Sequence, residues 1–384
     1  ESGAQVRPDV LLDLGTALID EGELRQAEQV LGTALDQAQN LGAEGLAARA
    51  RIELSALRAV VDSTARVEEI QKVAEEAMSV FERLGDEAGL SRAFLEVADV
   101  HWTRCRFGEM EQVLEQALTH AERAGEARER PWIQRSLAQA IVLGPRPVGV
   151  AIQRCDAILE EVAGDDLSAA FIQTMLAVLE AMCGRADNAR SLWQESQRRL
   201  REVGLNVRAL TQNVYRGMIE LMCEVPVDVT PELAEGCAML QKIGERSRLS
   251  TLAAVQARLL YSQGRYDESE EYATLSAGAA ANDDAGSQVF MRATRAMLEA
   301  RGGNARLAEE LSTSAVAIAA KTDSLVMHAD ALRDRAEVLT ILGRDAEAIN
   351  ELRYAITLYE RKNADGLAAA TQSLVEGLTP ARLG

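Results

Sequence analysis

A pattern of small and apolar residues that recurs about every 40 residues constrains this chain more than any other feature. In its first copy, a helix carrying Leu14-Gly15 and Leu18 is followed by a turn at Gly22 and by a second helix carrying Ala27. Clear later copies lie at 97–117, 176–193, 256–273, 303–315 and 336–355, and weaker ones at 57–77, 138–158 and 217–234.

The residue types in the pattern explain how each copy folds. Small residues on both helices let two antiparallel helices approach closely, and apolar residues three or four positions away fill the groove between them. A glycine after the first helix adopts the left-handed conformation that reverses the chain. One pair cannot bury its apolar face alone, so successive pairs must stack.

The pattern predicts an all-α fold: a right-handed superhelical solenoid of about nine antiparallel helix pairs plus a C-terminal capping helix, in one domain over residues 1–384. The capping helix is predicted at 364–375. First helices are predicted at 9–21, 43–61, 87–104, 130–143, 167–182, 206–223, 247–262, 285–301 and 324–342. Second helices are predicted at 24–41, 66–84, 108–124, 148–162, 186–203, 231–243, 266–280, 305–320 and 345–362.

Two connections differ from the rest and predict bends in the superhelix, near 144–147 and near 224–231. The first reads Gly-Pro-Arg-Pro, a rigid turn because proline fixes φ and stops a helix. The second is an extended connector in which Thr230 is expected to cap the helix that begins at Pro231. The alternative is that each is only a longer loop without a mechanical role.

The net charge of −19 excludes several classes of partner. A nucleic-acid-binding surface needs clustered Lys and Arg, and so does a surface that docks on anionic lipid. We therefore expect no nucleic acid and no membrane as partners of this segment. The acidity itself indicates solubility, with a dedicated basic partner as the alternative.

The five cysteines include no CxxC pair, and they lie in helical stretches beside apolar residues. They are interpreted as small buried hydrophobes in a reducing, cytoplasmic compartment. No run of eighteen apolar residues is present. The chain begins without Met, so we expect it to be a piece of a longer protein.

Particular phrases extend this interpretation to a family. The Leu14-Gly15 copy and the Leu260…Gly264-Arg265-Tyr266-Asp267-Glu268 copy resemble tetratricopeptide repeats. The phrases at 144–155, 179–185 and 287–293 resemble the C-terminal helical arm of actinobacterial multidomain regulators, in which a nucleotide-cyclase or other effector domain and a signalling ATPase module precede the arm. The resemblance implies an arm that senses a ligand or partner and restrains the ATPase, without catalysis in this segment.

The common signatures of catalysis and cofactor binding are missing from the sequence. There is no GxxxxGK[ST] phosphate loop and no GxSxG elbow. His101, His120 and His328 lie far apart and form no zinc-ligand spacing. Paired carboxylates are frequent, which in an acidic helical protein indicates solvated faces. We therefore predict no enzyme activity, no cofactor and no metal.

Ligand contacts in tetratricopeptide proteins come mainly from the inner faces of first helices, so the resemblance implies candidate sites there. Aromatic and Arg side chains are the usual anchors of recognition. The alternative is that Trp102 and Tyr261 only pack against the next repeat. Trp132 and Trp193 are expected in the core. The candidates are Arg92, Asp99, Trp102, Arg258, Tyr261, Phe290 and Arg333, with Asp330 and Glu337 on the same faces.

Arginines are frequent on the predicted first helices. If they share one face, they form a positive groove suited to an acidic peptide or an anionic ligand. The alternative is that they pair with Glu and Asp of adjacent helices. The residues are Arg92, Arg135, Arg216, Arg258, Arg292, Arg295, Arg333 and Arg335.

Taken together, the sequence predicts a non-catalytic protein-interaction or sensor arm of a bacterial signalling regulator, of transcriptional or cyclase type. Its concave face is expected to bind a partner domain, such as the ATPase or effector domain of the same protein, or a peptide or small effector. One alternative is an architectural module that forms a homodimer through an end repeat. Another is a solenoid that holds a small molecule in its groove.

Overall fold

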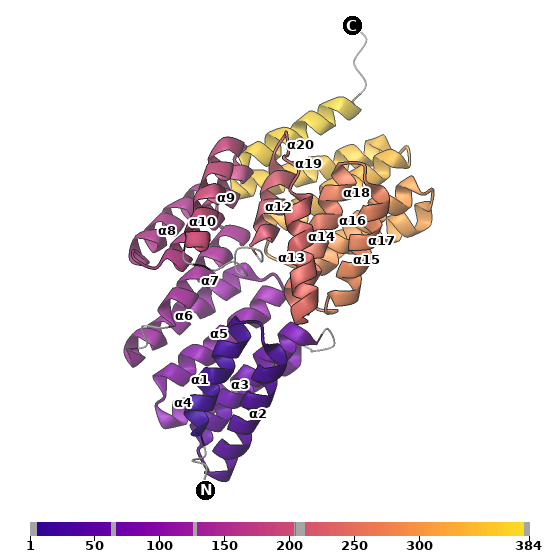
Figure 1. The fold of residues 1–384 in the computed structure, drawn as a ribbon. Coiled ribbons are helices and arrows are strands. Elements are labelled where there is room, and N and C mark those ends of the chain that lie inside the picture. Colours follow the sequence, from indigo (N-terminus) through magenta and orange to yellow (C-terminus); the bar gives the residue numbers. More distant parts are fainter. Residues whose placement is uncertain (1–5, 63–66, 126–128, 203, 205–211, 380–384) are drawn as a thin grey trace.

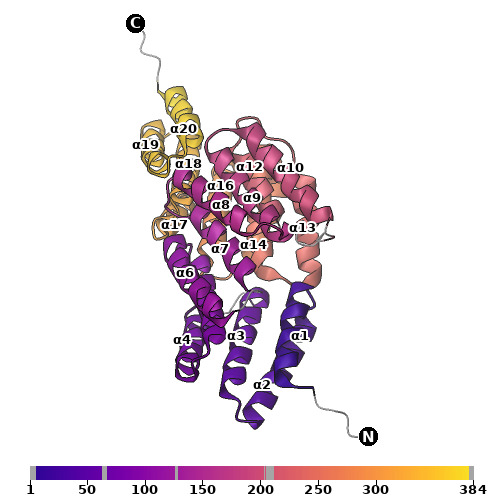
Figure 2. The same cartoon turned by 90° about the vertical axis from the view of Figure 1, so that its left-hand side faces the viewer.

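A computed structural model describes residues 6–62, 67–125, 129–202, 204 and 212–379. Within these ranges the chain forms nineteen helices and no strand, so the predicted all-α repeat solenoid is confirmed. Figures 1 and 2 show the helices stacked in antiparallel pairs from the N-terminal end to the C-terminal end of an elongated molecule.

The observed helices match the predicted pairs. Bounds agree within one residue wherever the predicted helix is fully described; part of the predicted helix 206–223 lies outside the described residues, and the last helix runs three residues further than predicted. The first helices are α1 (Pro8–Asp20), α3 (Glu44–Val61), α5 (Glu87–Thr103), α7 (Arg130–Leu143), α9 (Asp166–Met182), α12 (Asn213–Met222), α14 (Arg246–Ser262), α16 (Ala285–Arg301) and α18 (Leu325–Ile341). The second helices are α2 (Leu24–Asn40), α4 (Val67–Leu84), α6 (Phe107–Ala124), α8 (Val148–Glu161), α10 (Ala186–Glu202), α13 (Thr230–Ile243), α15 (Tyr266–Ala279), α17 (Ala305–Ala319) and α19 (Asp345–Lys362), and α20 (Asp365–Leu378) follows the last pair.

The pair α18–α19 shows how the repeat residues make this unit. Ala336 on α18 and Ala348 on α19 are buried and lie in one apolar cluster with leucines of both helices. Gly343, between the helices, has a φ of +75°, as predicted for the turn glycine. The next amide, of Arg344, donates back to the Leu339 carbonyl at 2.8 Å, which closes the turn.

One turn of this kind carries a different residue. The α5–α6 turn has Cys105 at the left-handed position, with a φ of +50°. A side chain in this conformation costs on the order of 1–2 kcal/mol relative to the right-handed one, so other contacts must hold Cys105 there.

The two proline connections are present, but the cap predicted in the second one is wrong. Helix α13 already begins at Thr230, which has helical geometry and makes no side-chain capping bond. Instead, Asp228 accepts hydrogen bonds from the backbone amide of Thr230 at 3.0 Å and from its hydroxyl at 2.7 Å. An aspartate two residues upstream can therefore accept the free backbone N–H at the start of α13 in place of a capping Thr230. The bends predicted at both connections remain predictions.

The superhelix turns back on itself, so that later repeats dock on earlier ones. The Asp283 carboxylate accepts a hydrogen bond from the Val67 amide at 3.0 Å, and Asp323 accepts one from the Phe107 amide at 2.8 Å. The partners in both bonds are 216 residues apart in sequence. The Lys362 ammonium continues this line of contacts by donating to two carbonyls at the end of α7. We call the line of contacts between 67–184 and 283–367 the seam.

The C-terminal part of the seam is apolar. Leu358, Tyr359 and Leu367, from the end of the chain, lie in one buried cluster with residues of α7 and α9, such as Ile141 and Leu179. Figure 1 shows α20 beside α9 at the upper end of the molecule, and the two helices are in contact. Figure 2 shows α17 directly above α6, where Asp323 meets the start of α6.

Candidate functional site

The concave face can be located from side chains that join first helices two pairs apart, because such helices approach each other only on the inner side of a superhelix. Arg258 of α14 forms an ion pair with Asp334 of α18. Tyr261 donates its hydroxyl hydrogen to Glu337 of α18 at 2.5 Å. In the first half of the chain, the Gln139 amide of α7 bonds to Tyr215 of α12. The concave row, as we call it, comprises Asp99, Gln139, Tyr215, Arg258, Asp334 and Glu337.

The predicted cluster of Arg258 and Tyr261 is a packed element of this face. The Arg258 guanidinium carbon lies 5.9 Å from the centre of the Tyr261 ring, and that of Arg301 lies 5.3 Å from it. Arg301 also donates to the Tyr261 hydroxyl at 2.7 Å. Tyr261 is only 5% exposed. Its main contacts are therefore with neighbouring repeats.

A second cluster holds Arg333, at the same level of α18. Arg333 lies 3.9 Å from the Asp330 carboxylate, which also accepts a hydrogen bond from the Tyr359 hydroxyl. Burial raises the pKa of Asp330, and it raises the pKa of Asp334 to about 6 although Arg258 opposes the shift. Acidic groups on this face are therefore held in a poorly solvated environment.

Asp99 of α5 differs from the other acidic groups of the row because its side chain is exposed. Its carboxylate forms no hydrogen bond or ion pair with another described residue. The protein around the Asp99 carboxylate nevertheless disfavours its charged form and raises its pKa to about 6, although Arg248 of α14 opposes the shift. One turn earlier, Glu96 is 4% exposed, its Oε1 has no hydrogen-bond partner in the described structure, and burial raises its pKa well above the ordinary value. Of these two acidic groups on α5, Asp99 is therefore the one open to a ligand.

The tryptophans do not all lie where the sequence predicted. Trp193 is 6% exposed, as expected for the core. Trp102 is half-buried, with its ring edge-on to Phe107 at 5.5 Å. Trp132 was predicted in the core but is 39% exposed, with the Arg135 guanidinium carbon 5.5 Å from its ring. Since Gln139 lies two turns after Trp132 on α7, Trp132 belongs to the concave face.

Seven of the eight arginines predicted for a positive groove are paired with acidic groups. Arg92 lies 2.6 Å from Glu53 and 2.6 Å from Glu129. Arg292 donates to the Gln288 side chain at 3.3 Å. The other six, Arg135, Arg216, Arg258, Arg295, Arg333 and Arg335, each lie within 3.9 Å of a carboxylate oxygen. Arg92, Arg135, Arg258, Arg295 and Arg335 pair outside their own helices, as the second alternative from the sequence has it, whereas Arg216 and Arg333 pair within their own helices. Pairing with carboxylates therefore describes these arginines better than an open positive groove.

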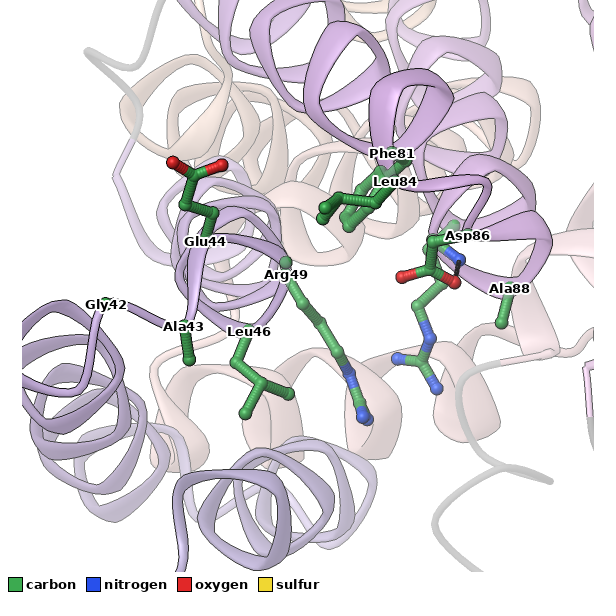
Figure 3. Close-up of a pocket in the computed structure, with 12 residues that line it drawn as sticks. Gly42, Ala43, Glu44, Leu46, Arg49, Phe81, Leu84, Asp86 and Ala88 are labelled. Carbon is green, nitrogen blue, oxygen red and sulfur yellow. Dashed lines mark hydrogen bonds between the residues drawn. The ribbon is translucent and has the colours of Figure 1, made fainter.

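A pocket of about 460 Å³ lies near the N-terminal end of this face, between the starts of α3 and α5. Figure 3 shows Arg49 extending into it between Leu46 and Asp86, with Phe81 and Leu84 on the upper wall. Arg92, one of the predicted site residues, also lines it. Arg49 is paired with Asp13 at 2.7 Å and Glu44 with Arg83 at 2.7 Å, so the pocket has a mixed wall on which these charged groups already have partners.

Of the seven predicted residues, the structure brings Arg258 and Tyr261 together and places Arg333 on their partner helix, α18. Phe290 is half-buried on α16, between these two helices. The sequence analysis missed Gln139, Tyr215 and Asp334, which join distant first helices. No short sequence motif marks such residues. Gln139, seven residues after Trp132, and Asp334, four residues after Asp330, do have the spacing of residues on one helix face.

The described residues contain no group of three or more His, Cys, Asp or Glu side chains placed to hold a metal ion. All five cysteines are described and are free, and three of them, Cys105, Cys155 and Cys237, are buried. Among the described helices, none combines the length and the apolar content that a membrane crossing would need.

No protein-family model and no curated protein matches this sequence. Solved structures match the fold. The crystal structure of a Rap protein complexed with Competence and Sporulation Factor aligns with a TM-score of 0.65 and 13% identity, over 93% of this chain and 99% of that chain.

Two further matches are more distant. A Signal Transduction ATPase with Numerous Domains (STAND) protein with a tetratricopeptide repeat sensor, from Pyrococcus horikoshii, aligns with a TM-score of 0.43 and 12% identity over 80% of this chain and 53% of that chain. Yeast Tom70 aligns with a TM-score of 0.32 and 12% identity over 97% and 92%. At these identities the likeness concerns the fold: the chain is a tetratricopeptide-like helical solenoid.

Proposed function

We propose that this chain is a non-catalytic interaction arm that binds a segment of a partner protein on its concave face. The observation that carries the proposal is the combination of Asp99, which is exposed and has no partner among the described residues, with the exposed Trp132 ring, on an inner face where most of the predicted arginines are paired with carboxylates. An open carboxylate and an exposed aromatic ring suit a ligand with a basic group, and Arg135 beside Trp132 shows that the ring accepts a cation. The expected segment is therefore basic rather than acidic.

Two further observations support this assignment. The Rap protein, which shares the fold over nearly the whole chain, was solved complexed with Competence and Sporulation Factor, so a helical protein of this fold and size forms a complex with another molecule. The phrases at 144–155, 179–185 and 287–293 resemble the arm of actinobacterial regulators. We therefore propose that the natural partner is a signalling or effector module, such as the ATPase domain of the same protein, in a cytoplasmic regulator.

A binding measurement with matched charge changes tests the proposal. Peptides tiled from candidate partner domains would be titrated by calorimetry against the native chain and against Asp99→Asn and Trp132→Ala. We expect a basic peptide whose affinity falls at least tenfold in both variants. Asp36→Asn removes the same charge from an exposed site on α2, a second helix, and is expected to leave the affinity unchanged. Equal loss in Asp36→Asn, or no loss in Asp99→Asn, would refute a concave site.

The pH dependence of binding sharpens the same test. Since the pKa of Asp99 is about 6, its carboxylate is charged at pH 7.5 and mostly protonated at pH 5. The affinity for a basic peptide should fall over this range in the native chain and should change less in Asp99→Asn. A pH profile that is identical in the two proteins would contradict the role of Asp99.

Self-association is a second candidate function, because α1 leaves an apolar face uncovered at the N-terminal end. Val10 and Leu14 lie one helical turn apart on this face and are 50% and 46% exposed. The end of a solenoid exposes the surface that another repeat would cover. Sedimentation of the native chain and of Leu14→Glu tests this function: a native monomer at high concentration would rule it out.

A further inference from the structure

The seam has a more polar half and a more apolar half. In the polar half, helix starts are capped from distant repeats beside two buried side chains, Cys105 and Phe107. Helix α6 lacks a side-chain cap from its own N-cap residue, Arg106. The Asp323 carboxylate supplies the cap from the α17–α18 connection, accepting from the amides of Phe107 at 2.8 Å and Gly108 at 2.7 Å. Asp283 acts in the same way on the Val67 amide, at the start of α4.

Cys105 lies in the middle of this polar half. Its contacts with the later repeats hold it in the left-handed conformation. Its carbonyl accepts a hydrogen bond from the Asp323 amide at 3.3 Å. Its thiol is buried and lies against Gly286, in the first turn of α16. The turn between α5 and α6 is therefore held from both sides by the second turn of the superhelix.

The apolar half is held by buried side chains. Leu358 and Tyr359 are at most 1% exposed and lie in one apolar cluster with residues of α7 and α9. Lys362 is fully buried beside them and donates to the carbonyls of Val142 at 2.8 Å and Gly144 at 2.6 Å. Separating this half would expose apolar surface to water, which is unfavourable.

The difference in chemistry determines which half opens first. In the polar half, the amides of Val67, Phe107 and Gly108 and the carboxylates of Asp283 and Asp323 all form good hydrogen bonds with water, so little free energy is lost on separation. In the apolar half, separation removes buried contacts that water does not replace. Contacts of the first kind open on their own in local fluctuations.

We propose that the seam is a clasp: its polar half opens while its apolar half stays docked. The movement does not depend on the proposed function of the concave face, and it can be measured without any ligand. Opening releases the start of α4 and the start of α6 together, because both are held by the same later repeats.

A disulfide across the seam provides the test. A Cβ atom built on Gly286 lies 3.4 Å from the Cys105 sulfur, and the glycine has no positive φ, so Gly286→Cys can pair with Cys105 with little rearrangement. Hydrogen exchange would be followed at Val67, Phe107 and Gly108, and at Ala177 in the apolar half. In the reduced variant the first three amides should exchange at least tenfold faster than Ala177. Oxidation should slow them at least tenfold and leave Ala177 unchanged.

Three further variants keep the test decisive if the disulfide variant folds poorly. Gly286→Ala adds the same Cβ without a thiol and should show no response to oxidant. Asp323→Asn should accelerate exchange at Val67 as well as at Phe107, although Val67 is bonded to Asp283 and not to Asp323. Asp86→Asn weakens a cap within a single repeat, at Gly89, and should leave Val67 unchanged. If the exchange rate of the Val67 amide changes neither on disulfide formation nor in Asp323→Asn, the proposed clasp is wrong.

Discussion

The two halves of the seam join the same kinds of elements at the same spacing in the chain, yet they are built from opposite chemistry. In the polar half, Asp283 and Asp323 place carboxylates on the positive ends of α4 and α6. In the apolar half, Lys362 places an amine on the negative end of α7, inside an apolar cluster. The comparison shows that repeat geometry sets where two turns of the superhelix meet. Single residues decide how stable the contact between those turns is.

The largest expected effect comes from equivalent glycines in the two halves, because each lies in the first turn of its helix. A Cβ on Gly366 would lie 2.6 Å from the Cys183 carbonyl carbon, whereas a Cβ on Gly286 meets its nearest neighbour at an ordinary 3.4 Å. Gly366→Ala should lower the free energy of unfolding by about 2 kcal/mol through overpacking. Gly286→Ala should raise it by about 0.5 kcal/mol, since alanine restricts the unfolded chain.

Denaturant unfolding of both variants beside the native chain measures this difference. If the two substitutions destabilise the chain equally, the tight contact of Gly366 with the α9–α10 turn is not a feature of the native structure. If Gly286→Ala alone destabilises it, the polar half is the more closely packed one.

A smaller effect is expected from the ionisation of Lys362. Burial lowers its pKa to about 7, although Cys155, Asp323 and Glu111 oppose the shift, and its ordinary value is 10.5. Between these values the unfolded chain binds a proton that the folded chain does not, so stability rises with pH from about 7 to 10.5 and falls again as the pH is lowered. The slope approaches at most about 1.4 kcal/mol for each pH unit.

Urea unfolding of the native chain and of Lys362→Met at pH 7 and pH 9 isolates this contribution. Other groups titrate alike in the two proteins, so their difference should grow with pH. Parallel pH profiles would mean that Lys362 is hydrated in the native state and that the apolar half is open to water.

The smallest effect is expected in the polar half. Asp323→Ala should lower the free energy of unfolding by about 1 kcal/mol, the usual contribution of a helix cap. Asp86→Ala, which removes a cap within one repeat, should lower it by a similar amount. Only Asp323→Ala should increase the reactivity of the Cys105 thiol toward a maleimide probe, because it frees the turn that buries Cys105. Equal reactivity in both variants would remove the distinction between seam caps and local caps.

The predictions from sequence succeeded where the signal repeats. The spacing of residues such as Ala336, Gly343 and Ala348 predicted the helix pairs and their turns, because these positions are set by contacts within one pair or between neighbours. Arg258 and Tyr261 lie on the inner face, where the repeat placed them, and their role in binding stays a prediction. Trp132 was misplaced because its burial depends on how strongly the superhelix curves, which no local spacing records.

The sequence by itself determined the units of this protein: antiparallel helix pairs, glycine turns and an apolar face on each pair that forces stacking. Only the tertiary structure decided that Asp283, Asp323 and Lys362 would reach repeats more than 200 residues away. The physical reason is that the pitch of a superhelix is the sum of small rotations between neighbouring helix pairs. A change in these rotations that is too small to alter any one pair therefore changes which distant residues meet.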